Sequence, residues 1–137
     1  MYQNLVIVGN LGRDPEMRYT PSGQAVTNMS VATNRRYTTS DGQQVEETTW
    51  FRVSVWGRQA ENVHQYLRKG RRVLVEGRLI PDDNGNPRIW NRQDGTPAAS
   101  FEVNAQRVVF LGGRDEGSFG DDDSFDDAPD TEDEIPF

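Results

Sequence analysis

Apolar side chains recur at every second position in several segments of the chain, and this period constrains the fold more than any other feature. Side chains alternate between the two faces of a β-strand, so the pattern predicts half-buried strands. Strands are predicted over residues 5–8, 25–37, 48–57, 71–80 and 99–105. The residues that share one face of each strand are Thr27, Met29 and Val31; Phe51, Val53 and Val55; Val73, Val75 and Leu79; and Ala99, Phe101, Val103 and Ala105. The chain is therefore predicted to be mainly β-structure.

One segment has a helical period instead. Within residues 59–69, Ala60, Val63 and Leu67 are spaced as on one face of a helix, and Gly70 provides a stop. The predicted order is three strands, a helix and two strands, which is the order of a five-stranded OB-type barrel. Other small barrels are also compatible with this order. Residues 81–97 are expected to form a long polar loop with turns at Asn84-Gly85 and Asp94-Gly95.

The charge distribution divides the chain near Gly112 and Arg114. All 15 Lys and Arg and 11 of the 22 acids precede residue 115, so this part has a net charge of +4. The remaining 11 acids follow it without a base, a net charge of -11. The acidic part has too little apolar surface to offset the entropy of ordering, which predicts disorder. We expect an all-β OB-fold domain over residues 1–112, a disordered acidic linker over 113–132 and an interaction tip over 133–137.

The composition argues against several classes of protein. The absence of Cys and the single His64 argue against thiol chemistry and multi-histidine metal sites, so no enzyme activity, cofactor or metal site is predicted. The clustered acids lie in the acidic tail, where disorder cannot hold catalytic geometry. No apolar run approaches the ~20 residues of a membrane-spanning helix. The first residues lack the features of a signal peptide, so a cytoplasmic location is expected.

The predicted strand from Trp50 to Trp56 has an unusual second face. Trp50, Arg52 and Trp56 point away from the apolar face, so a cation lies between two indoles separated by roughly 20 Å. Unpaired bases can stack on such rings, and the cation can meet phosphate. This arrangement predicts sequence-tolerant binding of single-stranded nucleic acid. The alternative is that both tryptophans are core or subunit-interface residues.

Two further segments combine aromatic rings with arginine. Arg35 and Arg36 precede Tyr37 at the end of a predicted strand, and Arg88 lies close to Trp90 in the long loop. Other cations could follow a nucleic-acid backbone, although each alone is equally compatible with a solvated surface. These are Arg58, Lys69, Arg71, Arg72 and Arg78.

At these residues the chain resembles the bacterial single-stranded DNA-binding protein family. The resemblance covers approximately Asn4 to Arg114 and the end of the tail. The matching stretches are Val8–Glu16, Thr49–Val53, Trp56–Arg58, Tyr66–Gly70, Val75–Gly77 and Leu111–Arg114. The loop over 81–97 is longer, and the linker shorter, than is common in the family.

The resemblance implies an OB fold, usually homotetrameric, that coats single-stranded DNA in replication, recombination and repair in the bacterial nucleoid. It implies stacking positions at Tyr37, Trp50, Trp56 and Trp90. It also implies backbone contacts near Arg52, Arg58, Lys69 and Arg88, to which the sequence adds Arg35 and Arg36. Phe51 occupies a position that often contacts another subunit.

The chain ends in Asp133, Glu134, Ile135, Pro136 and Phe137. A terminal aromatic ring beside a free carboxylate, preceded by acids, suits a basic, partly apolar docking site. By resemblance, this tip recruits genome-maintenance proteins. A simple solubility tail is the alternative.

Two other binding functions remain open from the sequence. Aromatic stacking would serve single-stranded RNA as well as DNA. The barrel could also be a protein-interaction OB module, in which case replacing Trp50 and Trp56 would leave binding intact.

Overall fold

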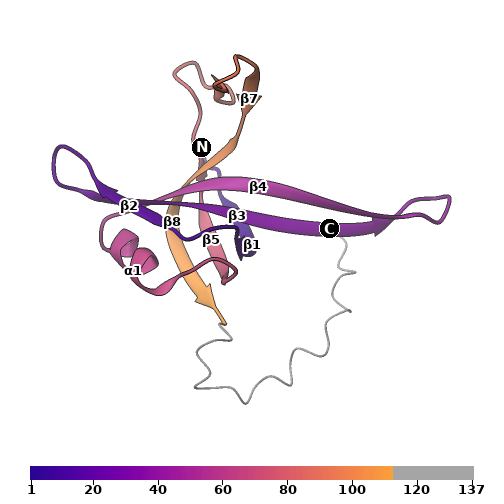
Figure 1. Cartoon of the computed structure of the whole chain (residues 1–137), viewed down its shortest axis with the longest axis horizontal. Helices are drawn as coiled ribbons and strands as arrows, with labels where there is room; N and C mark the ends of the chain where they lie inside the picture. The colour runs from indigo at the N-terminus through magenta and orange to yellow at the C-terminus, as the bar shows by residue number, and fades with distance from the viewer. Residues whose placement is uncertain (113–137) are drawn as a thin grey trace.

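The computed structural model describes residues 1–112 and consists of a β-barrel, one helix and hairpins that project from the barrel (Figure 1). The elements are β1 Leu5–Leu11, β2 Glu16–Tyr19, β3 Ala25–Thr38, β4 Gln44–Trp56, α1 Arg58–Tyr66, β5 Arg72–Leu79, β6 Ile89–Asn91, β7 Pro97–Ala99 and β8 Phe101–Leu111. The linker and tip predicted for residues 113–137 lie outside the described residues. No helix in the described part is long and apolar enough to cross a membrane.

The five long strands close into the predicted OB-type barrel. Their order is β1-β5-β8-β4-β3, and β1 returns to β3 through the pairs Asn10–Ala32 and Leu11–Val31. The strands β4 and β8 run parallel, whereas the other pairs of the barrel are antiparallel. Gly9 makes the closure possible, because a Cβ there would lie 2.2 Å from the carbonyl oxygen of Ala32.

The barrel interior contains the side chains that the two-residue period assigns to it. Fully buried apolar residues from four strands meet Val63 and Leu67 of the helical segment. The central members are Val31, Val53, Val55, Val73, Val75 and Val103. β-branched side chains favour strands and pack well on a pleated surface, so the same residues specify the strands and fill the core.

Three residues of these predicted faces are instead exposed, including Ala99 at the end of β7. Leu79 is 50% exposed and Phe101 is 60% exposed. Leu79 is the last residue of β5, and Phe101 is the first residue of β8, where it packs beside Phe51 with ring centroids 5.8 Å apart. The two-residue period continues to the strand ends, but the enclosed core does not.

The helix α1 is shorter than predicted. It ends at Tyr66 because Leu67 adopts an extended conformation, with φ -100° and ψ 149°. The Arg68 guanidinium then donates to the carbonyl oxygens of His64 and Leu67, at 3.1 and 2.7 Å. The Lys69 amide donates to Asp14 instead of continuing the helix, at 2.8 Å. Leu67 nevertheless remains in the core.

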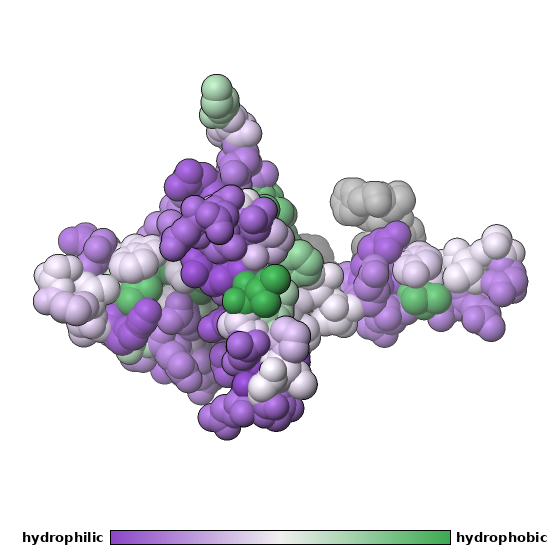
Figure 2. Space-filling view, turned by 90° about the horizontal axis from the view of Figure 1, so that it is seen from above, coloured by the Kyte–Doolittle hydropathy of each residue, from purple (hydrophilic) through white to green (hydrophobic). Residues whose placement is uncertain are grey.

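Several segments contain more β-structure than predicted, and β1 and β8 continue to Leu11 and Leu111, beyond their predicted ends at residues 8 and 105. The strand β2 lies in the stretch between β1 and β3 and pairs with β3 along its full length. The loop over 81–97 contains β6, and β7 follows at its end, so that a small two-stranded hairpin projects from the barrel (Figure 1). The strand β4 begins at Gln44, four residues earlier than predicted, and forms a long hairpin arm with β3. Seen from above, this arm projects from the body and is largely hydrophilic (Figure 2).

Candidate nucleic-acid interface

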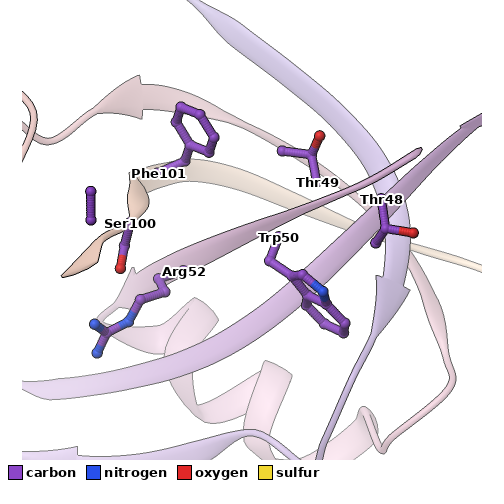
Figure 3. Close-up of a pocket in the computed structure, with 7 residues that line it drawn as sticks. Thr48, Thr49, Trp50, Arg52, Ser100 and Phe101 are labelled. Carbon is purple, nitrogen blue, oxygen red and sulfur yellow. The ribbon is translucent and has the colours of Figure 1, made fainter. Parts of the chain in front are cut away.

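The outer face of β4 presents the residues that the sequence singles out. Val53 and Val55 are buried, whereas Trp50 is 52% and Trp56 is 38% exposed. The Arg52 side chain, between them, is 58% exposed. Trp50 and Arg52 extend from the same side of the strand, and Phe101 points the other way (Figure 3). The two indoles therefore do not belong to the barrel core.

Trp50 is packed on one side only. An ideal Cβ on Gly12 would lie 2.5 Å from Cζ3 of Trp50, so the six-membered ring lies directly against the Gly12 backbone. The adjacent backbone is also fixed, since the Gly70 amide donates to the Leu11 carbonyl oxygen at 2.8 Å. Half of the Trp50 surface nevertheless remains open to solvent, which is the arrangement required of a stacking platform.

A depression of about 370 Å³ lies beside Trp50. Trp50 and Arg52 line it from β4, together with hydroxyl and apolar groups from both sides. The other lining residues are Thr48, Thr49, Ala99, Ser100 and Phe101. None of these five residues was predicted to line a binding site, and those near the start of β8 reach Trp50 only through the parallel pairing of β4 with β8.

The small hairpin brings Trp90 and Arg88 towards this depression. The Trp90 Nε1–H donates to the hydroxyl of Ser100, one of the lining residues, at 3.0 Å. The Arg92 guanidinium lies 5.9 Å from the centre of the Trp90 ring. Arg88 Nε lies 3.5 Å from Oε1 of Glu102, and Arg52 Nη1 lies 3.8 Å from Oε2 of the same carboxylate. Glu102 was not predicted from the sequence.

The candidates on the long arm lie further along β3. The Arg35 guanidinium lies 4.5 Å from the centre of the Tyr37 ring and is paired with Glu47 at 2.8 Å. Arg36 is 3.9 Å from Glu46. Cross-strand carboxylates therefore partly compensate both of these predicted phosphate-binding charges.

The remaining candidates are distributed around β4. Arg58 is exposed at the start of α1, two residues after Trp56. Lys69 is exposed in the turn beside Asp14 and Gly70, close in the chain to the residues that support Gly12. The structure thus groups Trp50, Arg52, Arg88 and Trp90 most closely. It places Tyr37, Trp56 and Arg58 on extensions of the same strand pair or on the adjoining helix.

Aspartates close the turn of the β3–β4 arm and the turn of the small hairpin. The Thr96 amide and hydroxyl hydrogens bond to Asp94 Oδ1 at 3.0 and 2.8 Å, and these bonds hold the pKa of Asp94 below its ordinary value of 3.8. The hydroxyl of Thr39 similarly lowers the pKa of Asp41. Within residues 1–112, no three His, Asp or Glu side chains are grouped so that they could hold a metal ion.

Comparison with known proteins agrees with this geometry. The model of the single-strand binding protein family matches residues 2–111. The chain belongs to this family. Single-stranded DNA-binding proteins from Wolinella succinogenes and Helicobacter hepaticus are 38% and 40% identical to it over 133 and 117 residues. These alignments cover 94% and 85% of the chain, and 78% and 65% of the respective relatives. The family resemblance read from the sequence is thereby confirmed.

Solved structures in the family share the fold. The single-strand binding protein of Plasmodium falciparum, solved as a complex with single-stranded DNA, superposes with a TM-score of 0.66 at 24% identity, covering 82% of this chain and 96% of that one. A deletion mutant of the Thermus aquaticus single-stranded DNA-binding protein gives a TM-score of 0.63 at 33% identity, covering 81% and 51%. The OB-type barrel is therefore the common architecture.

Proposed function

We propose that this chain binds and protects single-stranded DNA without strong sequence preference and without catalysis. The observation that carries the proposal is the exposed face of β4, where Trp50 and Trp56 flank Arg52. Membership of the single-strand binding family supports the same function. An apolar ring that remains half exposed on a rigid strand has a surface available for a base.

Stacking supplies the sequence-tolerant part of the affinity. Base–aromatic stacking contributes about 1–3 kcal/mol per base, a range measured on OB folds of this kind. Trp50 and Trp56 are the principal platforms, with Trp90 and Tyr37 as extensions. Every base has a π-face, so these rings discriminate weakly among sequences.

Phosphate contacts supply the salt-dependent part. Arg52, Arg58, Lys69 and Arg88 are the proposed backbone contacts around β4. Arg35 and Arg36 make weaker contributions because Glu47 and Glu46 already face them. Each phosphate neutralised on a single strand adds about -0.7 to the slope of log affinity against log salt.

A homotetramer is the proposed assembly. The outer face of β1, β5 and β8 carries an apolar row in which Val8 pairs with Leu74, and Leu74 pairs with Val109. Val6 and Val8 are 52% and 48% exposed. Association would remove this surface from water, and the family resemblance supports subunit contacts at Phe51 as well. Sedimentation equilibrium of the chain and of a Val8→Lys variant tests the assembly.

Replication, recombination and repair are the proposed cellular setting, in the bacterial cytoplasm and associated with the nucleoid. The named relatives come from bacteria such as Wolinella and Helicobacter. The acidic end, Asp133 to Phe137, would recruit other genome-maintenance proteins, as its charged and apolar composition suggests.

A length series of oligonucleotides tests the proposed function. Stacking on exposed indoles should quench tryptophan fluorescence, and the quenching should saturate once the strand spans the face of β4. Matched single-stranded RNA and duplex DNA serve as competitors. Equal competition by RNA would contradict a DNA-specific function, and an absence of quenching would contradict stacking.

A further inference from the structure

We propose that Glu102 is a positioning residue of the DNA-binding face, which holds Arg52 and Arg88 as a pair and moderates their attraction for phosphate. This inference rests on the proposed function, because it concerns two of the cations proposed to contact DNA. It assigns a role to an acidic residue in a place where negative charge should oppose binding.

Glu102 is held where three segments of the chain meet. It lies in β8 directly opposite Arg52 of the parallel strand β4. Its backbone carbonyl oxygen accepts a hydrogen bond from the Ile80 amide at 2.9 Å, just after β5 ends. The backbone of Glu102 is therefore held by strand pairing on one side and by the Ile80 amide on the other.

Each carboxylate oxygen faces a different arginine. Oε2 lies 3.8 Å from Arg52 Nη1, and Oε1 lies 3.5 Å from Arg88 Nε. Arg88 is also held from the other side, since its Nη2 donates to the Pro81 carbonyl oxygen at 3.1 Å. One acid thus links the base of the small hairpin to the stacking strand.

The acid is more deeply buried than the two arginines that it faces. The Glu102 side chain is only 17% exposed, whereas those of Arg52 and Arg88 are 58% and 44% exposed. The two distances exceed those of strong hydrogen bonds, so N–H groups remain available to a ligand. The arginines face solvent with the acid beneath them. In the Arg35–Glu47 pair, by contrast, both partners are more than half exposed.

This arrangement has a consequence for the free protein. A nearby carboxylate lowers the local positive potential, so that fewer solution anions gather at the two guanidinium groups. Two arginines that are partly compensated by Glu102 neutralise less of the phosphate charge and release fewer counterions from the DNA, so the salt dependence is shallower. Glu102 should keep the two arginines ordered and make their contact with phosphate readily reversible.

The test compares Glu102→Gln with Glu61→Gln in the full chain. Both changes remove one negative charge and preserve side-chain size, but Glu61 is exposed on α1. With a deoxythymidine oligonucleotide at low salt, Glu102→Gln should bind about two- to five-fold more tightly than Glu61→Gln, the scale of one partly exposed ion pair. Its salt slope should also be steeper, because no carboxylate then competes with phosphate for the two arginines. Equal behaviour of the two variants, or weaker binding by Glu102→Gln, would overturn the inference.

A second comparison, in a variant that lacks both arginines, distinguishes a failure of this inference from a failure of the proposed function. If Arg52→Gln with Arg88→Gln weakens binding, the two cations contact DNA, and adding Glu102→Gln should then produce no gain beyond that of Glu61→Gln. A gain that persists without the arginines would overturn the role of Glu102 while leaving the proposed function intact. If removing both arginines leaves affinity and salt slope unchanged, the proposed backbone contacts themselves fail. Circular dichroism melting of each variant confirms that the comparison concerns folded protein.

Discussion

The backbone of Gly12 lies against the six-membered ring of Trp50, and no side chain larger than hydrogen fits between them without a shift of the indole. The Cζ3–Cη2 edge of the ring is thereby supported by backbone at the end of β1, while about half of the side-chain surface stays open. Support of this kind fixes the platform before a ligand arrives, which reduces the entropy lost on binding.

Replacing Gly12 with Ala should therefore disturb binding without touching DNA. The new Cβ would lie 2.5 Å from Trp50, so the ring must rotate away from its supported position. We expect weaker binding to oligonucleotides and an altered tryptophan emission spectrum in the free protein. In a Trp50→Ala background the same change should have no further effect on affinity. Additive losses would show that Gly12 acts independently of the indole.

Truncating the platforms should reduce affinity directly. Trp50→Ala and Trp56→Ala should each cost about 1–3 kcal/mol of binding free energy, the value of one stacked base. Both variants should remain folded, because neither ring belongs to the barrel core, although part of each ring is packed against the barrel. Trp50→Phe and Trp56→Phe are the matched controls and should retain most of the affinity. If the Ala and Phe variants bind equally, stacking is not the source of the affinity.

A side chain of α1 stabilises an irregularity in the barrel. The pairing of β5 with β8 shifts between Glu76 and Gly77, which leaves Gln106 as a bulge. The side-chain Nε2 of Gln59 donates to the Gln106 carbonyl oxygen, and its Oε1 accepts a hydrogen bond from the backbone amide of Val108, both at 3.1 Å. Gln59→Ala should lower the free energy of unfolding by about 1–3 kcal/mol, since two hydrogen bonds are lost.

Chemical denaturation at fixed protein concentration measures this loss. Gln65→Ala, an exposed change on the same helix, is the control and should be nearly neutral. Gln59→Glu retains the side-chain acceptor but loses the donor. Its free energy of unfolding should therefore lie below that of Gln65→Ala. A neutral Gln59→Ala would mean that the bulge is stable without the side chain.

The outer face of β4 could be predicted because alternation is a local property. Side chains alternate along any strand, so Trp50, Arg52 and Trp56 must share one face of β4 whichever strands lie beside it. The core positions on β3 and β4 followed in the same way. The end of α1 could not be predicted as easily, because the Lys69 amide is bound by Asp14, 55 residues away in sequence.

The missed features depend on non-local pairing. The strand β2 contains Glu-Met-Arg-Tyr, which has no clear period, and is defined by its pairing with β3. Glu102 becomes the partner of Arg52 only through the parallel pairing of β4 with β8. An isolated acid in a strand has no feature that distinguishes it from a solvated surface charge. Knowledge of the strand order would have supplied the missing information.

The turn of the small hairpin should respond to acid. The pKa of Asp94 lies below 3.8 because the Thr96 amide and hydroxyl hydrogen-bond to the carboxylate. A lowered folded-state pKa means that the carboxylate stabilises the turn fully above the ordinary value and loses this effect as the pH falls through the lowered pKa. The Thr96 amide resonance should titrate over that range. Asp94→Asn should abolish this titration, and a pH-independent Thr96 resonance in the original chain would contradict the assignment.

The acidic end should act on partner proteins and not on DNA. Residues 133–137 combine two acids with Ile, Pro and Phe, and the proposed DNA contacts all lie within residues 1–112. Deleting residues 135–137 should leave oligonucleotide affinity within about two-fold, because no stacking ring or phosphate contact is removed. The same deletion should abolish pull-down of replication and repair proteins from a bacterial lysate. Deleting residues 118–120 is the control of equal length and should preserve both properties, whereas a loss of DNA binding on removing the tip would place the tip within the DNA-binding surface.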